Sequence, residues 1–80
     1  MAEYIAGPIY TPDSSWVDGF AYGFNEGEIG LFIAFKGTLI FYPEMDERVF
    51  FSLHRAKSKG EWVHDNVYDS PYVIVGEGFG

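Results

Sequence analysis

The stretch LHRAKSKGEW, residues 53–62, holds the side chains whose types and spacing come nearest to a binding site. Arg55, Lys57 and Lys59 bring three cations close together in a chain whose net charge is -7. Such a cluster can contact a phosphate or an acidic partner. Cations also suit the end of a helix, where they stabilise the negative pole of the helix dipole. We expect chiefly a helix end here, and secondarily a contact patch for something acidic.

Catalysis or metal binding would have to use His54 and His64, together with Asp65. These groups could form an acid–base pair or a metal site, but no further ligands follow at metal-binding spacing. Ser58 has no Gly-x-Ser-x-Gly element around it. The glycine-rich GEGFG at 76–80 lacks the following helix that a phosphate loop needs. We therefore expect a protein that is not an enzyme and holds no metal or cofactor.

Aromatic residues make up 20% of the chain, enough to build a core in a short sequence. Trp16, Tyr42 and Trp62 could also form a stacking platform for bases. Recognition of single-stranded nucleic acid needs a basic rim beside such a platform, and no basic residues surround these strands in the sequence. Packing in the core or an interface is the favoured role, with Tyr42 and Trp62 kept as candidate contacts for a partner or RNA.

Charge is unevenly distributed along the chain. All five Lys and Arg residues lie between positions 36 and 59, while residues 1–30 and 61–80 carry acidic residues and neither Lys nor Arg. Phosphate neutralisation dominates nucleic-acid affinity, so we expect no strong general binding to RNA or DNA. The N-terminus has neither a basic start nor a long apolar run, so we expect no signal peptide, no membrane span and a cytoplasmic location.

Alternating apolar residues predict three antiparallel strands, at 15–24, 29–36 and 38–42. The NEGE sequence forms the first turn. The second turn is the Lys-Gly pair at 36–37, because glycine accepts the positive φ of a tight hairpin. Short connections of this kind favour a meander of neighbouring strands.

The apolar spacing becomes helical after the third strand. The stripe consists of Val49, Phe50, Leu53 and Ala56. Asp46 is a good N-cap and Gly60 a good stop, so we predict one helix over about 46–59 that covers the sheet. Residues 61–72 lack clear periodicity and should be extended or form a single turn. The predicted class is α+β: a small antiparallel β-meander of three strands packed by one α-helix, plus a C-terminal strand.

The C-terminal strand is YVIV at 72–75, which is uncharged and strongly β-prone. Left unpaired it would be prone to aggregation, so it should pair within the fold or with another chain. We predict a homo-oligomer, most simply a two-fold dimer. Its contacts would come from Tyr72, Val73, Ile74, Val75 and Phe79. In the competing account the segment folds back on its own sheet and the protein is a monomer.

Short motifs over residues 14–68 follow the pattern of a known family. They are Ser14-Ser15, Leu31-x-Ile33-x-Phe35, the Gly37 turn, Tyr42, Phe50, Ala56-x-Ser58-x-Gly60, Trp62-Val63 and Val67. In these the chain resembles the KTSC domain, a small module found at the C-terminus of some lysyl-tRNA synthetases and as stand-alone bacterial or phage proteins. The chain departs from the family at Ile40, at Met45-Asp46 and at Tyr68, where the family has tyrosine, Val-Pro and often arginine.

The resemblance implies one family-like domain at 14–68, with an N-terminal arm at 1–13 and a C-terminal strand and Gly-rich tail at 69–80. It also implies a bacterial cell or a phage-infected host. The sequence therefore predicts a small non-enzymatic interaction module that acts through homo-oligomer or protein-partner contacts. Two alternatives stay open: an RNA- or tRNA-associated accessory domain, and a small-ligand binder with an aromatic-lined pocket.

Overall fold

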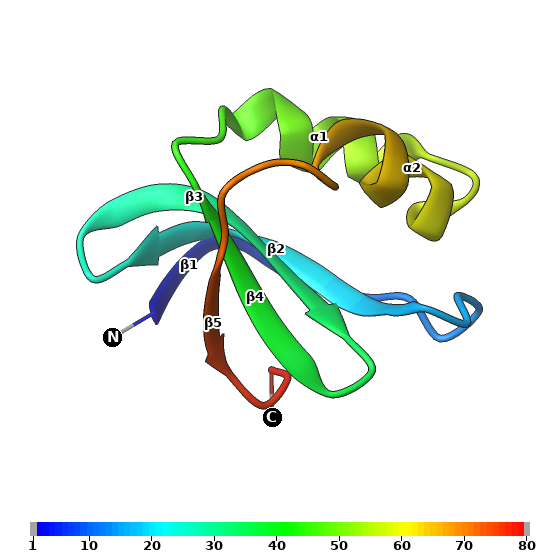
Figure 1. Ribbon diagram of the computed structural model, residues 1–80, viewed down its shortest axis with the longest axis horizontal. Coiled ribbons are helices and arrows are strands. Elements are labelled where there is room, and N and C mark those ends of the chain that lie inside the picture. Colours follow the sequence, from blue (N-terminus) through cyan, green and yellow to red (C-terminus); the bar gives the residue numbers. More distant parts are fainter. Residues whose placement is uncertain (1, 80) are drawn as a thin grey trace.

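Five antiparallel strands form one sheet in sequence order, and two helices lie together over one face of it (Figure 1). This arrangement comes from a computed structural model that describes residues 2–79. The strands are β1 Ala2–Tyr10, β2 Val17–Asn25, β3 Glu28–Phe35, β4 Thr38–Pro43 and β5 Val73–Gly76; the helices are α1 Glu47–Arg55 and α2 Lys59–Asn66. The α+β class is confirmed, while the predicted three-strand meander with one helix lacks a strand and a helix.

Both predicted hairpin turns are present and have the same backbone form. Glu26 and Gly27 have φ values of 52° and 84°, and Lys36 and Gly37 have 45° and 86°. A two-residue turn in which both residues have positive φ has a backbone twist that matches the right-handed twist of the two strands it joins. The Asp18 carboxylate also accepts a hydrogen bond of 2.7 Å from the backbone N–H of Gly37.

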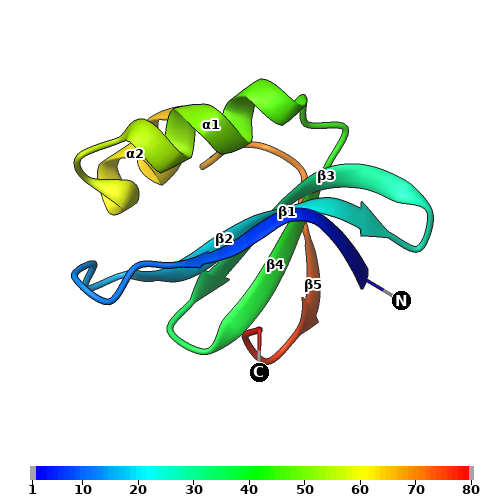
Figure 2. The ribbon, with the colours of Figure 1, turned by 180° about the vertical axis from the view of Figure 1, so that it is seen from behind.

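Both faces of the sheet are buried, and different parts of the chain cover them. The helix-side cluster consists of Val17, Phe20, Tyr22, Leu31, Ile33, Tyr42, Phe50, Leu53, Trp62, Val63 and Val67. The cluster on the other face consists of Ala21, Phe32, Ala34, Leu39 and Phe41. Within residues 2–79 no helix covers this second face (Figure 2), and Ala2 and Phe79 from the two ends of the chain pack against its cluster. The Tyr4 ring lies 5.0 Å from Phe32 and 5.6 Å from Phe79, between centroids.

The N-terminal segment, expected to be an arm, forms β1 and pairs with β2 along the edge of the sheet. Two register shifts interrupt this pairing, between Tyr4 and Ala6 and between Ala6 and Ile9. Each shift moves the following side chains to the opposite face, so the segment shows no clean period of two. Pro8 further disguises the strand, because proline is confined largely to sheet edges.

The helical region contains two helices where one was predicted. Asp46 caps α1 as expected: its carboxylate accepts a 2.8 Å hydrogen bond from the N–H of Arg48, which holds the pKa of Asp46 below its usual value. However, α1 ends at Arg55, because Ala56 is extended with ψ at 135°. Ser58 then caps α2, its hydroxyl accepting a 3.3 Å bond from the N–H of Glu61.

The predicted stop at Gly60 is therefore wrong, since Gly60 lies in the first turn of α2. The Ser58-x-x-Glu61 spacing is that of a capping box, a helix start signal. Residues 61–66, predicted to be extended or a single turn, continue this second helix.

The apolar run near the C-terminus pairs within its own sheet. In the β4–β5 ladder, Ile74 lies opposite Ile40 and Val73 opposite Phe41. This pairing is the one that the monomer account requires. In the Gly-rich tail beyond β5, Phe79 packs on the second face of the sheet; Gly80 lies outside the described residues.

Candidate functional site

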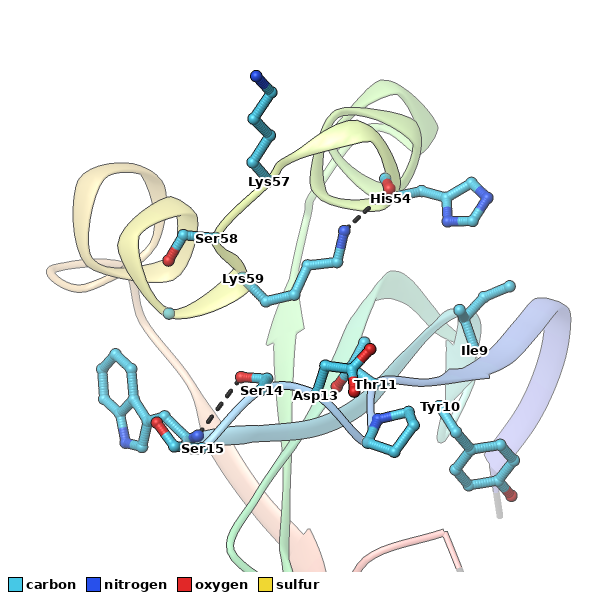
Figure 3. A pocket seen from close by; sticks show the side chains of 13 residues that line it. Ile9, Tyr10, Thr11, Asp13, Ser14, Ser15, His54, Lys57, Ser58 and Lys59 are labelled. Carbon is cyan, nitrogen blue, oxygen red and sulfur yellow. Dashed lines mark hydrogen bonds between the residues drawn. The ribbon is translucent and has the colours of Figure 1, made fainter.

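A cleft of about 510 Å³ lies between two connections of the chain (Figure 3). One wall is the β1–β2 connection with the end of β1, and the other is the α1–α2 connection with its flanking residues. We call this feature the loop cleft; it is lined by Ile9, Tyr10, Thr11, Pro12, Asp13, Ser14, Ser15, Trp16, His54, Lys57, Ser58, Lys59 and Gly60. Its lining includes Lys59 and the exposed Trp16.

Hydrogen bonds within the β1–β2 connection hold Trp16 at the cleft. The Ser14 hydroxyl oxygen accepts from the backbone N–H of Val17 at 3.0 Å and from that of Trp16 at 3.4 Å. The Thr11 hydroxyl donates to the carbonyl of Val17. Trp16 stays 38% exposed while its ring packs on Phe35, 5.5 Å away between centroids.

Gly60 allows α2 to begin directly against that ring. A Cβ at Gly60 would lie 3.0 Å from Cε3 of Trp16, closer than side chains ordinarily approach. The absence of a side chain therefore lets the two walls meet at this end of the cleft.

The three cations predicted at a helix end have separate roles. Arg55 is the last residue of α1, as expected. Lys59 belongs to α2, yet its ammonium donates to the carbonyls of His54 at 2.9 Å and Ala56 at 2.6 Å, so it stabilises the end of the preceding helix. Lys57 points away from the loop cleft into solvent (Figure 3).

The two aromatic candidates are core residues. Tyr42 is 5% exposed and Trp62 is 8% exposed, and both belong to the helix-side cluster. The indole N–H of Trp62 donates to the Ser52 hydroxyl at 2.8 Å, which satisfies its polar atom inside the fold. The structure thus buries Tyr42 and Trp62 in the core and leaves Trp16 partly exposed in the loop cleft.

The two histidines have different neighbours. The His54 ring stacks on Phe50 at 6.3 Å between centroids, while His64 lies 5.2 Å from the Tyr68 ring and 3.5 Å from an Asp65 carboxylate oxygen. Within residues 2–79, no group of three His, Cys, Asp or Glu side chains is placed to hold a metal ion.

The predicted oligomer contacts are divided between two places. Tyr72, Val73, Ile74 and Val75 are all exposed, and Ile74 is 64% exposed. Among the described strands none pairs with the outer edge of β5. Phe79 instead contacts Tyr4 and Tyr10 of its own chain. We refer to residues 72–76 as the β5 edge.

Comparison of the chain with protein-family models, with curated proteins and with solved structures gives no match. The resemblance to the KTSC domain therefore stays a prediction from its sequence motifs. In the part of the chain from residue 2 to residue 79, neither helix has the length and apolar character needed to cross a bilayer.

Proposed function

We propose that the protein is a non-enzymatic interaction module that pairs with a second copy of itself through the β5 edge. The observation that supports this most strongly is the exposure of every residue of β5 on an open edge of the sheet. Backbone N–H and C=O groups on such an edge are available to another strand, and adjacent apolar side chains gain by becoming buried. Among its four residues, Val73, Ile74 and Val75 present that apolar surface.

The absence of charge along the β5 edge favours a second copy of the chain as its partner. No charged residue occurs between Asp69 and Glu77. Two copies of the β5 edge can therefore pair antiparallel around Ile74 without placing like charges directly opposite one another, as a two-fold interface requires. Because a strand of four residues is short, the interface will be small and the dimer weak and readily reversible.

The net charge adds a further property to this dimer. Each copy carries -7, so the two repel one another at low ionic strength. Salt screens this repulsion, and the dimer should become tighter as salt is added. Nucleic-acid binding through lysine and arginine would show the opposite dependence.

Two lysine substitutions test the proposal as a matched pair. Ile74→Lys puts a cation on the β5 edge, and Ile5→Lys puts one on β1, where Ile5 is similarly exposed at 57%. Sedimentation equilibrium, from micromolar to millimolar protein, should show wild type and Ile5→Lys moving from 9.1 kDa towards twice that mass. Ile74→Lys should weaken the dimer by at least about tenfold, ~1.4 kcal/mol, because two cations then face one another.

Three outcomes would contradict self-pairing through β5. The wild type could remain at the mass of one chain over the whole range. The two lysine variants could weaken association equally, which would show that the interface does not lie at β5. A wild-type dimer that dissociates on addition of salt would show that ion pairs, and not an apolar strand edge, hold the copies together.

A further inference from the structure

The loop cleft has the size and lining of a small-ligand site. Its volume of about 510 Å³ falls within the usual range of such sites, roughly 300–1,000 Å³. Apolar side chains and polar groups of two connections face the same space. No feature of self-pairing through β5 uses this cleft, which lies between β1–β2 and α1–α2.

One part of the cleft suits a planar ring. The backbone N–H of Trp16 donates to the Ser14 hydroxyl at 3.4 Å, and its ring packs on Phe35. The exposed part of Trp16 offers a flat apolar surface on which another ring can stack. Stacking of this kind does not depend on which hydrogen-bonding groups the ring carries.

The adjoining part of the cleft suits an anion. Lys59 extends along the space between the two connections (Figure 3). Two of its three N–H donors bind the carbonyls at the end of α1, and the ammonium lies 6.0 Å from the centroid of the Phe20 ring, which leaves one donor for a ligand. Among the residues that line the cleft, Asp13 is the one carboxylate, and Lys59 is the lysine whose side chain lies across the cleft, because Lys57 points away from it (Figure 3). Lys59 therefore places a positive charge beside the cleft in a chain of net charge -7.

Three serine hydroxyls add donors beside Lys59. The oxygens of Ser14 and Ser58 accept hydrogen bonds from backbone N–H groups, so their own O–H groups remain free to donate. Ser15 lines the same cleft, and its hydroxyl makes no hydrogen bond with residues 2–79. A lysine combined with hydroxyl donors is a suitable set for phosphate or carboxylate oxygens.

We infer that the loop cleft binds a small anion carried on a planar ring, with the ring on Trp16 and the anionic group near Lys59 and the serines. The anionic group is a phosphate or a carboxylate, since both present the oxygen acceptors that these donors require. A nucleoside monophosphate and an aromatic carboxylate are the two simplest sources of this chemistry.

The two tryptophans provide a test with an internal control. In a ¹⁵N-labelled sample, AMP, benzoate, adenosine and inorganic phosphate are titrated separately while the indole N–H signals are followed by NMR. AMP or benzoate should shift the Trp16 indole and the Gly60 amide in a saturable way. The Trp62 indole, which is buried and bonded to Ser52, should not move. Tighter binding of AMP identifies a phosphate ligand, and tighter binding of benzoate a carboxylate.

Adenosine, which lacks the anion, and phosphate, which lacks the ring, should each bind at least about tenfold more weakly than the better of the two complete probes. The inference is overturned if neither AMP nor benzoate gives a saturable shift at millimolar concentration. It is also overturned if adenosine or phosphate alone binds as tightly as the complete probes, or if the Trp62 indole shifts as much as that of Trp16.

Substitutions then locate the anion. Ser15→Glu adds a negative charge to an exposed position of the cleft and should weaken binding by about tenfold without disturbing the core. Lys59→Met removes the proposed contact, and Lys57→Met removes the same charge from a side chain that points away (Figure 3). Lys59→Met should abolish binding and Lys57→Met should leave most of it. Because Lys59 also stabilises α1, Ser15→Glu decides the question if Lys59→Met fails to fold; unchanged affinity in Ser15→Glu contradicts the placement of the anion.

Discussion

The two edge strands of the sheet differ in almost every property that controls strand pairing. β1 has nine residues, two register shifts and Pro8, which has no N–H to donate. β5 has four residues, and its apolar side chains are exposed with no charge or proline among them. Irregularity, proline and charge are common means of preventing edge-to-edge association, and so is a very short strand; β5 has only the last of these. This difference is the reason why the proposed pairing uses β5 and not β1.

The largest expected change in stability tests how closely β1 packs against β2. Gly23 of β2 leaves no room for a side chain, because a Cβ there would lie 2.0 Å from the carbonyl oxygen of Glu3 in β1. Gly23→Ala should therefore force β1 away from β2 and lower the free energy of unfolding by about 1–3 kcal/mol or more.

The matched variant on the other edge is Gly76→Ala. A Cβ at Gly76 would meet no atom within 4 Å, so the change in unfolding free energy should stay within about 0.5 kcal/mol. Urea unfolding of both variants gives the comparison. Equal stability losses would mean that the two edges are equally tolerant and that β1 is not the more constrained one.

The second effect concerns Phe79, which joins the two edges because it follows β5 and packs on β1. Its ring lies 5.6 Å from that of Tyr4 and 6.2 Å from that of Tyr10, in edge-to-face arrangements. Phe79→Ala should lower the free energy of unfolding by roughly 1–2 kcal/mol, since each aromatic pair contributes about 0.5–1.5 kcal/mol beyond buried area.

The same variant distinguishes an internal contact from an oligomer contact. Because Phe79 packs within its own chain, Phe79→Ala should leave the dimer affinity of the folded protein close to that of wild type. A variant with wild-type stability and a lost dimer would instead place Phe79 in the interface, as the sequence first suggested.

The smallest expected change is a loss of folding stability at alkaline pH. Burial raises the pKa of Tyr4 in β1 and of Tyr42 in β4 above the usual 10.0, and the neighbouring phenols of Tyr10 and Tyr72 raise them further. A raised pKa means that the folded state holds the proton more tightly than the unfolded state does. This contribution to stability is complete below pH 10 and is lost as the pH rises through the folded-state pKa.

Phenylalanine variants assign this loss to the two sides of the sheet. Tyr42 is more buried than Tyr4, so Tyr42→Phe should remove more of the alkaline decline in stability than Tyr4→Phe. Thermal unfolding between pH 9 and pH 11 measures the decline. If the double variant declines as steeply as wild type, other groups cause the loss.

The sequence by itself determined the elements whose signals are local. Alternating residues and the two-residue turns at 26–27 and 36–37 identify β2, β3 and β4, since a strand's side chains alternate and positive φ favours glycine. Asp46 identifies the start of α1 because a cap bonds to an N–H only two residues away. The start of α2 was equally local, in Ser58 and Glu61, but the helical stripe before it concealed the signal.

Only the tertiary structure decided what depends on residues far apart in the chain. It brought Trp16 against Gly60 and into the same cleft as Lys59, although the sequence shows no basic residue near that strand. It also buried Tyr42 and Trp62, which the sequence left as candidate contacts, and turned Phe79 onto β1. The physical reason is that burial and the choice of an open edge depend on how the twisted sheet closes, which no local pattern of residues encodes.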